Sequence, residues 1–200
     1  MTEGLTATVE PSRAPKRAAA LPADERRSMI VQATLPLLLE NGEMVTTRQI
    51  ADAAGIAEGT IFRVFADKDA VIAAVIDAAL DNEPLERALA GIDLSIAFEP
   101  AVVAAIEILQ QRVVDVWRLV SSIGTRFHDH AKRPMADSDA LVTLFDEHRD
   151  KLSVEPIAAA RLLRAFTLSA THPMLVGEPM SPPEIVKLFL HGVCAGSASC

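Results

Sequence analysis

The stretch TTRQIADAAGIAEGTIFRVFADK, residues 46–68, decides the fold of this 200-residue chain. Its threonine pair can cap a short helix, since a threonine oxygen accepts a bond from a first-turn amide. That helix carries Ile50 and Ala51 and ends at Gly55, a residue type that tolerates the positive φ of a tight turn. A second short helix is expected over residues 58–65. The pattern predicts two short helices that cross closely, a helix-turn-helix.

Helices are also predicted on both sides of this stretch. The first begins at Asp24, which can cap it, and ends at Asn41-Gly42. Pro36 lies inside it and is expected to bend the helix rather than break it. Asp67 is expected to cap the helix that follows the helix-turn-helix. Further helices are predicted over residues 84–92, 100–127, 138–152, 156–172 and 182–193.

The composition favours an all-α fold of about nine helices. Half of the residues are apolar, which excludes a disordered chain. The chain has 9 glycines, one tryptophan and no tyrosine, fewer turn and strand residues than a β-sandwich or barrel needs.

The cysteines and the apolar runs favour a soluble, cytoplasmic protein. Cys194 and Cys200 have no metal-ligand spacing and can crosslink nothing distant, which favours a reducing compartment. The first twenty residues lack the apolar core of a signal peptide. The apolar run at residues 70–80 is shorter than the roughly 18 residues that a membrane span requires. We therefore expect no membrane partner.

The charge is distributed unevenly along the chain. The net charge is −8, but residues 11–27 carry five basic and two acidic side chains, a local +3. Residues 71–200 carry 11 basic and 17 acidic side chains, a local −6. We expect a flexible basic arm at residues 1–23, a helix-turn-helix domain at 24–70 and a helical body at 71–200. Such an arm can meet a phosphate backbone although the whole chain is acidic.

The run from Ile30 to Lys68 resembles the DNA-binding domain of the tetracycline-repressor (TetR) family of transcriptional regulators. The resemblance is carried by IVQATLPLLLENG at residues 30–42, by the core TTRQIADAAGIAEGTIF at 46–62, and by Phe65, Asp67 and Lys68. Residues 81–200 are similar to the family only in length and helical character. The resemblance implies an N-terminal three-helix DNA-binding domain and a C-terminal helical domain for ligand binding and dimerisation.

The resemblance also implies which residues contact DNA. Arg63 is expected to read a guanine edge, and Lys68 to bind a phosphate at the start of a helix. The full set of expected contacts within the helix-turn-helix is Thr46, Thr47, Arg48, Glu58, Gly59, Thr60, Arg63 and Lys68. In the arm, Arg13, Lys16 and Arg17 are expected to add phosphate contacts.

Three positions depart from the family pattern and remove polar phosphate contacts. Ala57 stands where a serine often caps the recognition helix, Phe62 where tyrosine is common, and Val64 where histidine is frequent. We expect Phe62 and Phe65 to be core residues. Glu58 faces anionic DNA, so it either accepts a bond from a cytosine amine or turns away.

A broad apolar stripe on the long helix from Pro100 has two interpretations. Core packing is one, and the wall of a cavity for a small, largely apolar effector is the other. The candidate pocket residues, including polar contacts, are Gln110, Arg112, Val113, Trp117, Phe127, Phe145, Phe166 and His172.

The last two predicted helices favour a homodimer. Residues 157–170 have a face of small side chains, and residues 183–193 are apolar around much of their circumference. Two such helices from each subunit can form a four-helix interface about a two-fold axis.

The sequence therefore predicts a dimeric, ligand-responsive DNA-binding regulator, a repressor released from a palindromic operator by its effector. One alternative is a helical binding or adaptor protein without DNA. Another is a small-molecule enzyme that uses His128 or His130. The two histidines flank Asp129 but have no third ligand at a convincing spacing, so no metal site, cofactor or catalytic residue is expected.

Overall fold

The computed structural model of the protein describes residues 22–124 and 136–193. Several predicted features lie outside these residues: the arm cations Arg13, Lys16 and Arg17, the pocket candidate Phe127, the histidines 128 and 130, and both cysteines.

Every regular element of the described residues is helical, which confirms the all-α prediction. In chain order the elements are α1 (Ala23–Asn41), the 3-10 turn η1 (Gly42–Met44), α2 (Thr47–Ala54), α3 (Glu58–Ile61), α4 (Lys68–Ala79), α5 (Glu83–Ala90), α6 (Phe98–Ile123), α7 (Asp139–Asp146), the 3-10 turn η3 (Arg149–Lys151), α8 (Pro156–Thr171), α9 (Pro173–Val176) and α10 (Pro182–Val193).

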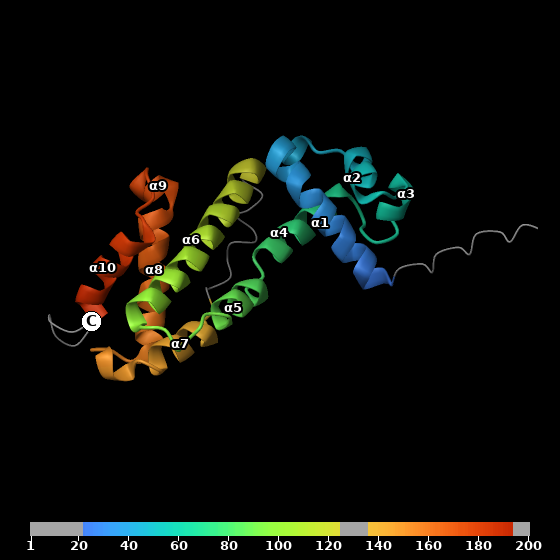
Figure 1. The fold of residues 1–200 in the computed structure, drawn as a ribbon. Coiled ribbons are helices and arrows are strands. Elements are labelled where there is room, and N and C mark those ends of the chain that lie inside the picture. The colour runs from blue at the N-terminus through green and yellow to red at the C-terminus, as the bar shows by residue number, and fades with distance from the viewer. Residues whose placement is uncertain (1–21, 125–135, 194–200) are drawn as a thin grey trace, which may run out of the picture.

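The helices form two groups joined by α6. Helices α1 to α4 lie at one end of the molecule and α8 to α10 at the other, and α6 runs between them (Figure 1). One buried apolar cluster takes residues from α1, α2, α3 and α4. The second takes residues from α5, α6, α7, α8 and α10.

Helix α6 contributes to both clusters. Its first half, with Ala105 and Ile106 fully buried, packs in the second cluster. Its last turns place Leu119 and Ile123 in the first cluster, beside the helix-turn-helix. A Cβ added to Gly42, directly after α1, would lie only 2.5 Å from the backbone oxygen of Ser122. The end of α6 therefore lies in close contact with the end of α1.

Helix starts and ends agree with the prediction at most positions. Helix α1 passes through Pro36 unbroken. Thr46 and Asp67 cap α2 and α4 through their side chains, as expected. Asp24 does not cap α1, because the helix starts one residue earlier and Pro22 occupies the cap position.

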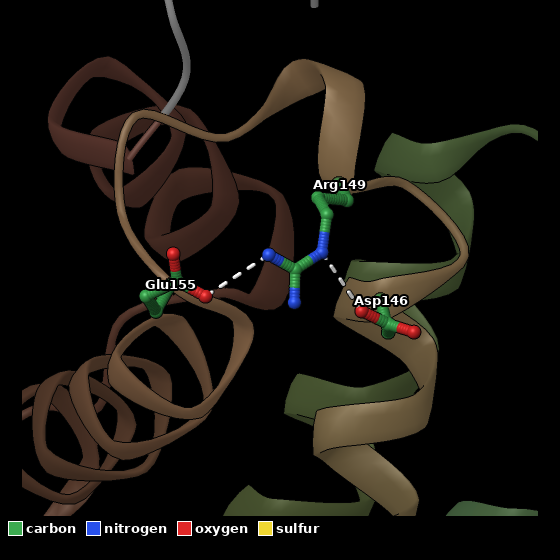
Figure 2. A network of polar contacts seen from close by, with 3 residues as sticks. All are labelled: Asp146, Arg149 and Glu155. Atoms are coloured by element: carbon green, nitrogen blue, oxygen red, sulfur yellow. Dashed lines mark hydrogen bonds and ion pairs between the residues drawn. The ribbon is translucent and has the colours of Figure 1, made fainter.

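Three helices end at least four residues earlier than predicted. Helix α3 ends at Ile61 rather than at residue 65, because residues 62–64 form a turn. Helix α6 ends at Ile123 because Gly124 has a φ of 58°, and α7 ends at Asp146 rather than near residue 152. After α7, the Arg149 guanidinium contacts Asp146 and Glu155, each at 3.0 Å (Figure 2). The carboxylates raise the pKa of Arg149, chiefly through these hydrogen bonds. The short helix α9 was not predicted, although Pro173 marks its first turn.

Among the described helices, none is both long enough and apolar enough to cross a lipid bilayer.

Candidate nucleic-acid interface

A capping box fixes the start of α2. The Thr46 hydroxyl accepts a bond from the Gln49 backbone amide at 3.2 Å, and the Gln49 Oε1 accepts one from the Thr46 amide at 2.8 Å. The Thr46 hydroxyl also donates to the same Oε1 at 2.9 Å. The Thr46 side chain therefore forms its hydrogen bonds within the chain. The backbone amides of the first two helical residues have no partner within the helix, as at every helix start.

The turn between α2 and α3 depends on Gly55. This residue is left-handed, with φ 65° and ψ 33°, and its amide donates to the Asp52 carbonyl at 3.2 Å. The Ile56 amide donates back to the Ala51 carbonyl at 3.0 Å. No atom lies within 4 Å of a Cβ placed at Gly55, so the turn requires glycine for its φ and not for space.

Helix α3 is short and presents one side to solvent. It begins at Glu58 without a side-chain cap, because Ala57 stands at the cap position. Ile61 and Phe65 are buried in the first cluster and hold α3 against α2. Phe62 is 50% exposed, which corrects the expectation that it is a core residue. It lies one position from Ile61, so it points away from the buried side of the helix.

The Thr47 hydroxyl joins the starts of the two helices by donating to Oε1 of Glu58. Thr47 is half-buried and Glu58 is exposed. Thr47 and Glu58 are both expected to contact DNA, and in the structure they contact one another. The hydroxyl proton of Thr47 is therefore already donated within the chain.

The cations of this region differ in their contacts. Arg48 and Arg63 are exposed, and neither forms an ion pair with the described residues. The half-buried Lys68 instead donates from Nζ to the carbonyls of Glu43 and Val45, at 3.0 and 3.1 Å. Lys68 thereby fixes the connection between α1 and α2, and its predicted phosphate contact stays a prediction.

Sequence reasoning missed the Thr47–Glu58 and Lys68 contacts. Glu58 lies eleven residues after Thr47, and Lys68 lies 25 and 23 residues from its acceptors. Contacts at such separations depend on how the helices cross, which no local pattern encodes. The remaining residues of the predicted contact set, Gly59 and Thr60, are exposed and half-buried in α3.

Several candidates for the effector pocket come together between α6 and the end of α8. The rings of Trp117 and His172 meet edge-on with centroids 4.4 Å apart. Two turns earlier on α6, the Gln110 amide donates to the Thr171 hydroxyl at 3.0 Å and to the Met180 carbonyl at 2.8 Å. The predicted polar contact Gln110 thus holds α6 against the chain around α9.

The other pocket candidates do not join this group through any contact that the structure records. Phe145 is fully buried and packs against Phe98 and Phe189, with ring centroids 6.0 and 6.1 Å away. Arg112 donates to the Asp81 carbonyl at 3.0 Å, and its partial burial lowers its pKa. Val113 and Phe166 are half-buried. Their places in a pocket wall stay predictions.

A groove of about 300 Å³ lies between α1 and α4, lined by Arg27, Ser28, Val31, Gln32, Ala74, Asp77 and Ala78. It is distant in sequence from the predicted effector residues. Within residues 22–124 and 136–193, no group of three histidines, cysteines or carboxylates is placed to hold a metal ion.

Residues 30–75 match the family model described as bacterial regulatory proteins, tetR family. This match confirms the resemblance drawn from the helix-turn-helix motif. No curated protein is significantly similar to the chain in sequence.

Solved structures share the fold over most of the chain. A TetR transcriptional regulator from Streptomyces coelicolor is 18% identical, with a TM-score of 0.53, and the match covers 86% of this chain and 99% of that one. NalD, the secondary repressor of the MexAB-OprM multidrug efflux pump in Pseudomonas aeruginosa, is 21% identical, with a TM-score of 0.51 and coverage of 87% and 100%. SmeT, the repressor of the multidrug efflux pump SmeDEF in Stenotrophomonas maltophilia, is 20% identical, with a TM-score of 0.55 and coverage of 87% and 93%. At these identities the likeness shows a TetR-type fold.

Proposed function

We propose that this chain, with its TetR-family sequence at residues 30–75 and its TetR-type fold, is a dimeric DNA-binding transcriptional repressor. The observation that carries the proposal is the helix-turn-helix of α2 and α3. Its turn, its cap and its buried side fix the crossing of two short helices, while Arg48 and Arg63 remain exposed. This is the arrangement by which a second helix enters a major groove.

The proposed DNA contacts divide into two kinds. Arg63, on the turn after α3, reads a base edge together with Glu58, Gly59 and Thr60 of α3. Phosphate contacts come from the first turn of α2, from Arg48 and Lys68, and from the arm residues Arg13, Lys16 and Arg17. The domain boundaries at residues 23 and 70 are part of the same proposal.

The proposed dimer forms through α8 and α10. Ile157 and Leu162 on α8 are 40% and 49% exposed, and Leu188 on α10 is 52% exposed. Large apolar side chains on two neighbouring helices favour burial against a second copy. A two-fold axis would space two recognition helices for half-sites about 34–36 Å apart, one turn of DNA.

The proposed effector is a small, largely apolar molecule that binds near Trp117 and His172. It would favour a state in which the half-site separation differs, so that effector and DNA weaken one another's binding by linkage. The efflux-pump repressors NalD and SmeT support a regulator over an enzyme, because their fold is shared over most of this chain.

The decisive experiment is selection of bound genomic fragments by the full-length chain in low salt. We expect an inverted repeat whose half-sites are one turn apart. If no fragment is preferred over random competitor, the chain is a helical binding or adaptor protein and the proposal fails.

A further inference from the structure

We propose that Glu58 selects a cytosine in each half-site, and that Thr47 positions its carboxylate for this contact. The inference rests on the proposed function and adds to it the identity of one base. Three observations carry it: the bond between the two side chains, the exposure of Glu58, and the charge of the surrounding stretch.

The bond fixes one oxygen of the carboxylate and leaves the other open. The Thr47 hydroxyl donates to Oε1, and no described residue donates to Oε2. Because Thr47 is half-buried in the first turn of α2, it holds Glu58 between the starts of α2 and α3. Glu58 is therefore not turned away from the proposed DNA-facing side. It is held there as an exposed acceptor.

The charge of this stretch makes a carboxylate without a hydrogen-bond donor unfavourable beside DNA. Between residues 46 and 68, Arg48, Arg63 and Lys68 balance Asp52, Glu58 and Asp67, so the local net charge is zero. Lys68 is turned to backbone carbonyls, and Glu58 has no cation among the described residues. An ionised carboxylate near phosphates is repelled unless a donor on a base compensates for the repulsion.

The major-groove edges of the four bases favour cytosine as that donor. Guanine and thymine present acceptors, which a carboxylate cannot satisfy. Adenine offers N6–H but places the N7 acceptor beside it, whereas cytosine offers its N4 amino group. A carboxylate that is held in one orientation loses less side-chain freedom on binding than a free one.

The test is selection of randomised duplexes by the full-length chain and by variants at both positions. The wild-type chain is expected to enrich cytosine at one fixed place in each half-site. The Glu58→Gln variant is expected to enrich adenine instead of cytosine at that place, because an amide pairs with both N6 and N7 of adenine. The cytosine-to-adenine ratio should fall about tenfold or more.

Thr47→Val and Thr47→Ser separate positioning from recognition. Thr47→Val removes the donor and is expected to weaken the cytosine preference without replacing it by another base. Thr47→Ser keeps the hydroxyl and is expected to retain the preference. Thermal melting of each variant shows whether α2 is intact.

Glu99→Gln is the matched control, since Glu99 is an exposed carboxylate in the first turn of α6 and the charge change is the same. It should leave the base preference unchanged.

The inference and the proposed function fail in different ways. If Glu58→Gln tightens binding to all duplexes equally, the carboxylate only repels DNA and the inference is wrong. If the wild-type chain selects an inverted repeat in which no base depends on residue 58, the inference fails while the proposed function stands. If the wild-type chain selects no duplex, both fail.

Discussion

At the scale of single residues, Arg63 carries the clearest expectation for DNA recognition. It is exposed on the turn after α3 and has no ion pair among the described residues. Arg63→Ala is expected to weaken specific binding by about 1–3 kcal/mol and to relax one base position. Titration against matched and mismatched duplexes measures both effects, with Arg118→Ala on the exposed side of α6 as the control. An equal loss on every sequence would make Arg63 a phosphate contact.

Among the glycines that the structure describes, Gly42 has the least tolerance for a side chain. Its φ of 54° with ψ −139° disfavours other residues, and a Cβ would lie 2.5 Å from the Ser122 backbone oxygen. Gly42→Ala is expected to lower the free energy of unfolding by at least about 2 kcal/mol.

Urea unfolding tests this, with two other glycines as references. Gly55→Ala has open space but keeps the left-handed φ, so it should cost about 1–2 kcal/mol. Gly59→Ala lies in α3 with open space and should cost nothing or stabilise by up to about 1 kcal/mol. A Gly42 variant as stable as the Gly59 variant would show that the close contact at Ser122 relaxes easily.

The residue scale also shows where sequence reasoning succeeds. The left-handed turn at Gly55 and the helix caps at Thr46 and Asp67 agree with the prediction, because each depends on neighbours within four residues. The exposure of Phe62 was not predicted, since an apolar residue in a four-residue helix can point either way. Glu58 and Lys68 lie on the predicted elements, but their partners come from other parts of the chain, at the start of α2 and in the connection between α1 and α2.

At the scale of elements, α2 depends on its capping box. The Thr46 hydroxyl satisfies the Gln49 amide at 3.2 Å. Thr46→Ala is expected to lower the free energy of unfolding by about 1 kcal/mol. Thr143→Ala is the matched control, because that hydroxyl bonds only the Asp139 carbonyl within α7, where it adds little. Equal losses in urea unfolding would mean that the cap contributes nothing beyond a removed hydroxyl.

The start of α7 is linked to α8 by a bidentate ion pair whose strength depends on pH. Arg161 donates to both carboxylate oxygens of Asp137 at 2.7 Å, and these bonds lower the pKa of Asp137. A carboxylate with a lowered folded-state pKa stabilises the protein above its ordinary pKa of 3.8 and loses this contribution as pH falls through the lowered value.

Asp137→Asn is therefore expected to lower the melting temperature at pH 7, and the difference from wild type should vanish in strong acid. The pair is exposed, so the effect is expected to be small. Melting curves at several pH values measure it. Arg161→Gln in the Asp137→Asn background should add no further loss, whereas additive losses would contradict a direct interaction.

Helix ends were predicted less well than helix positions, for reasons visible in the structure. The end of α6 follows from the backbone of Gly124. Beyond the end of α7, Arg149 contacts Glu155 six residues away, a contact that local periodicity does not encode. Single apolar residues recur at helical spacing beyond both ends, at Phe127 and Leu152, so periodicity alone extends the helices too far.

At the scale of the whole molecule, the exposed leucines of α8 and α10 predict assembly. Leu162→Lys combined with Leu188→Lys is expected to raise the dissociation constant of the dimer at least about tenfold, because lysines in an apolar interface lose their hydration. Sedimentation over a range of concentrations measures the shift.

Leu39→Lys on α1 is the control for added charge, since Leu39 is 44% exposed and distant from the last helices in sequence. A wild-type chain that remains monomeric at all concentrations, or a dimer unaffected by both lysines, would contradict an interface on α8 and α10.

The architecture was predictable from composition and from residues 46–68, whereas the packing of the body was not. The apolar stripe of α6 fits either a core or a cavity, and the structure assigns different members different neighbours. Ile106 lies in the second buried cluster, and Trp117 meets His172. The proposed effector site consists of side chains that sequence periodicity treats as equivalent.

The two α6 side chains in the first cluster have a consequence for the order in which the protein matures during synthesis. Helices α1 to α4 are translated first, but Leu119 and Ile123 complete their apolar interior only some forty residues later. A nascent or truncated chain that stops after α4 would leave that apolar interior exposed to water and would be prone to aggregation. Translation must therefore pass the end of α6 before the helix-turn-helix has its full support.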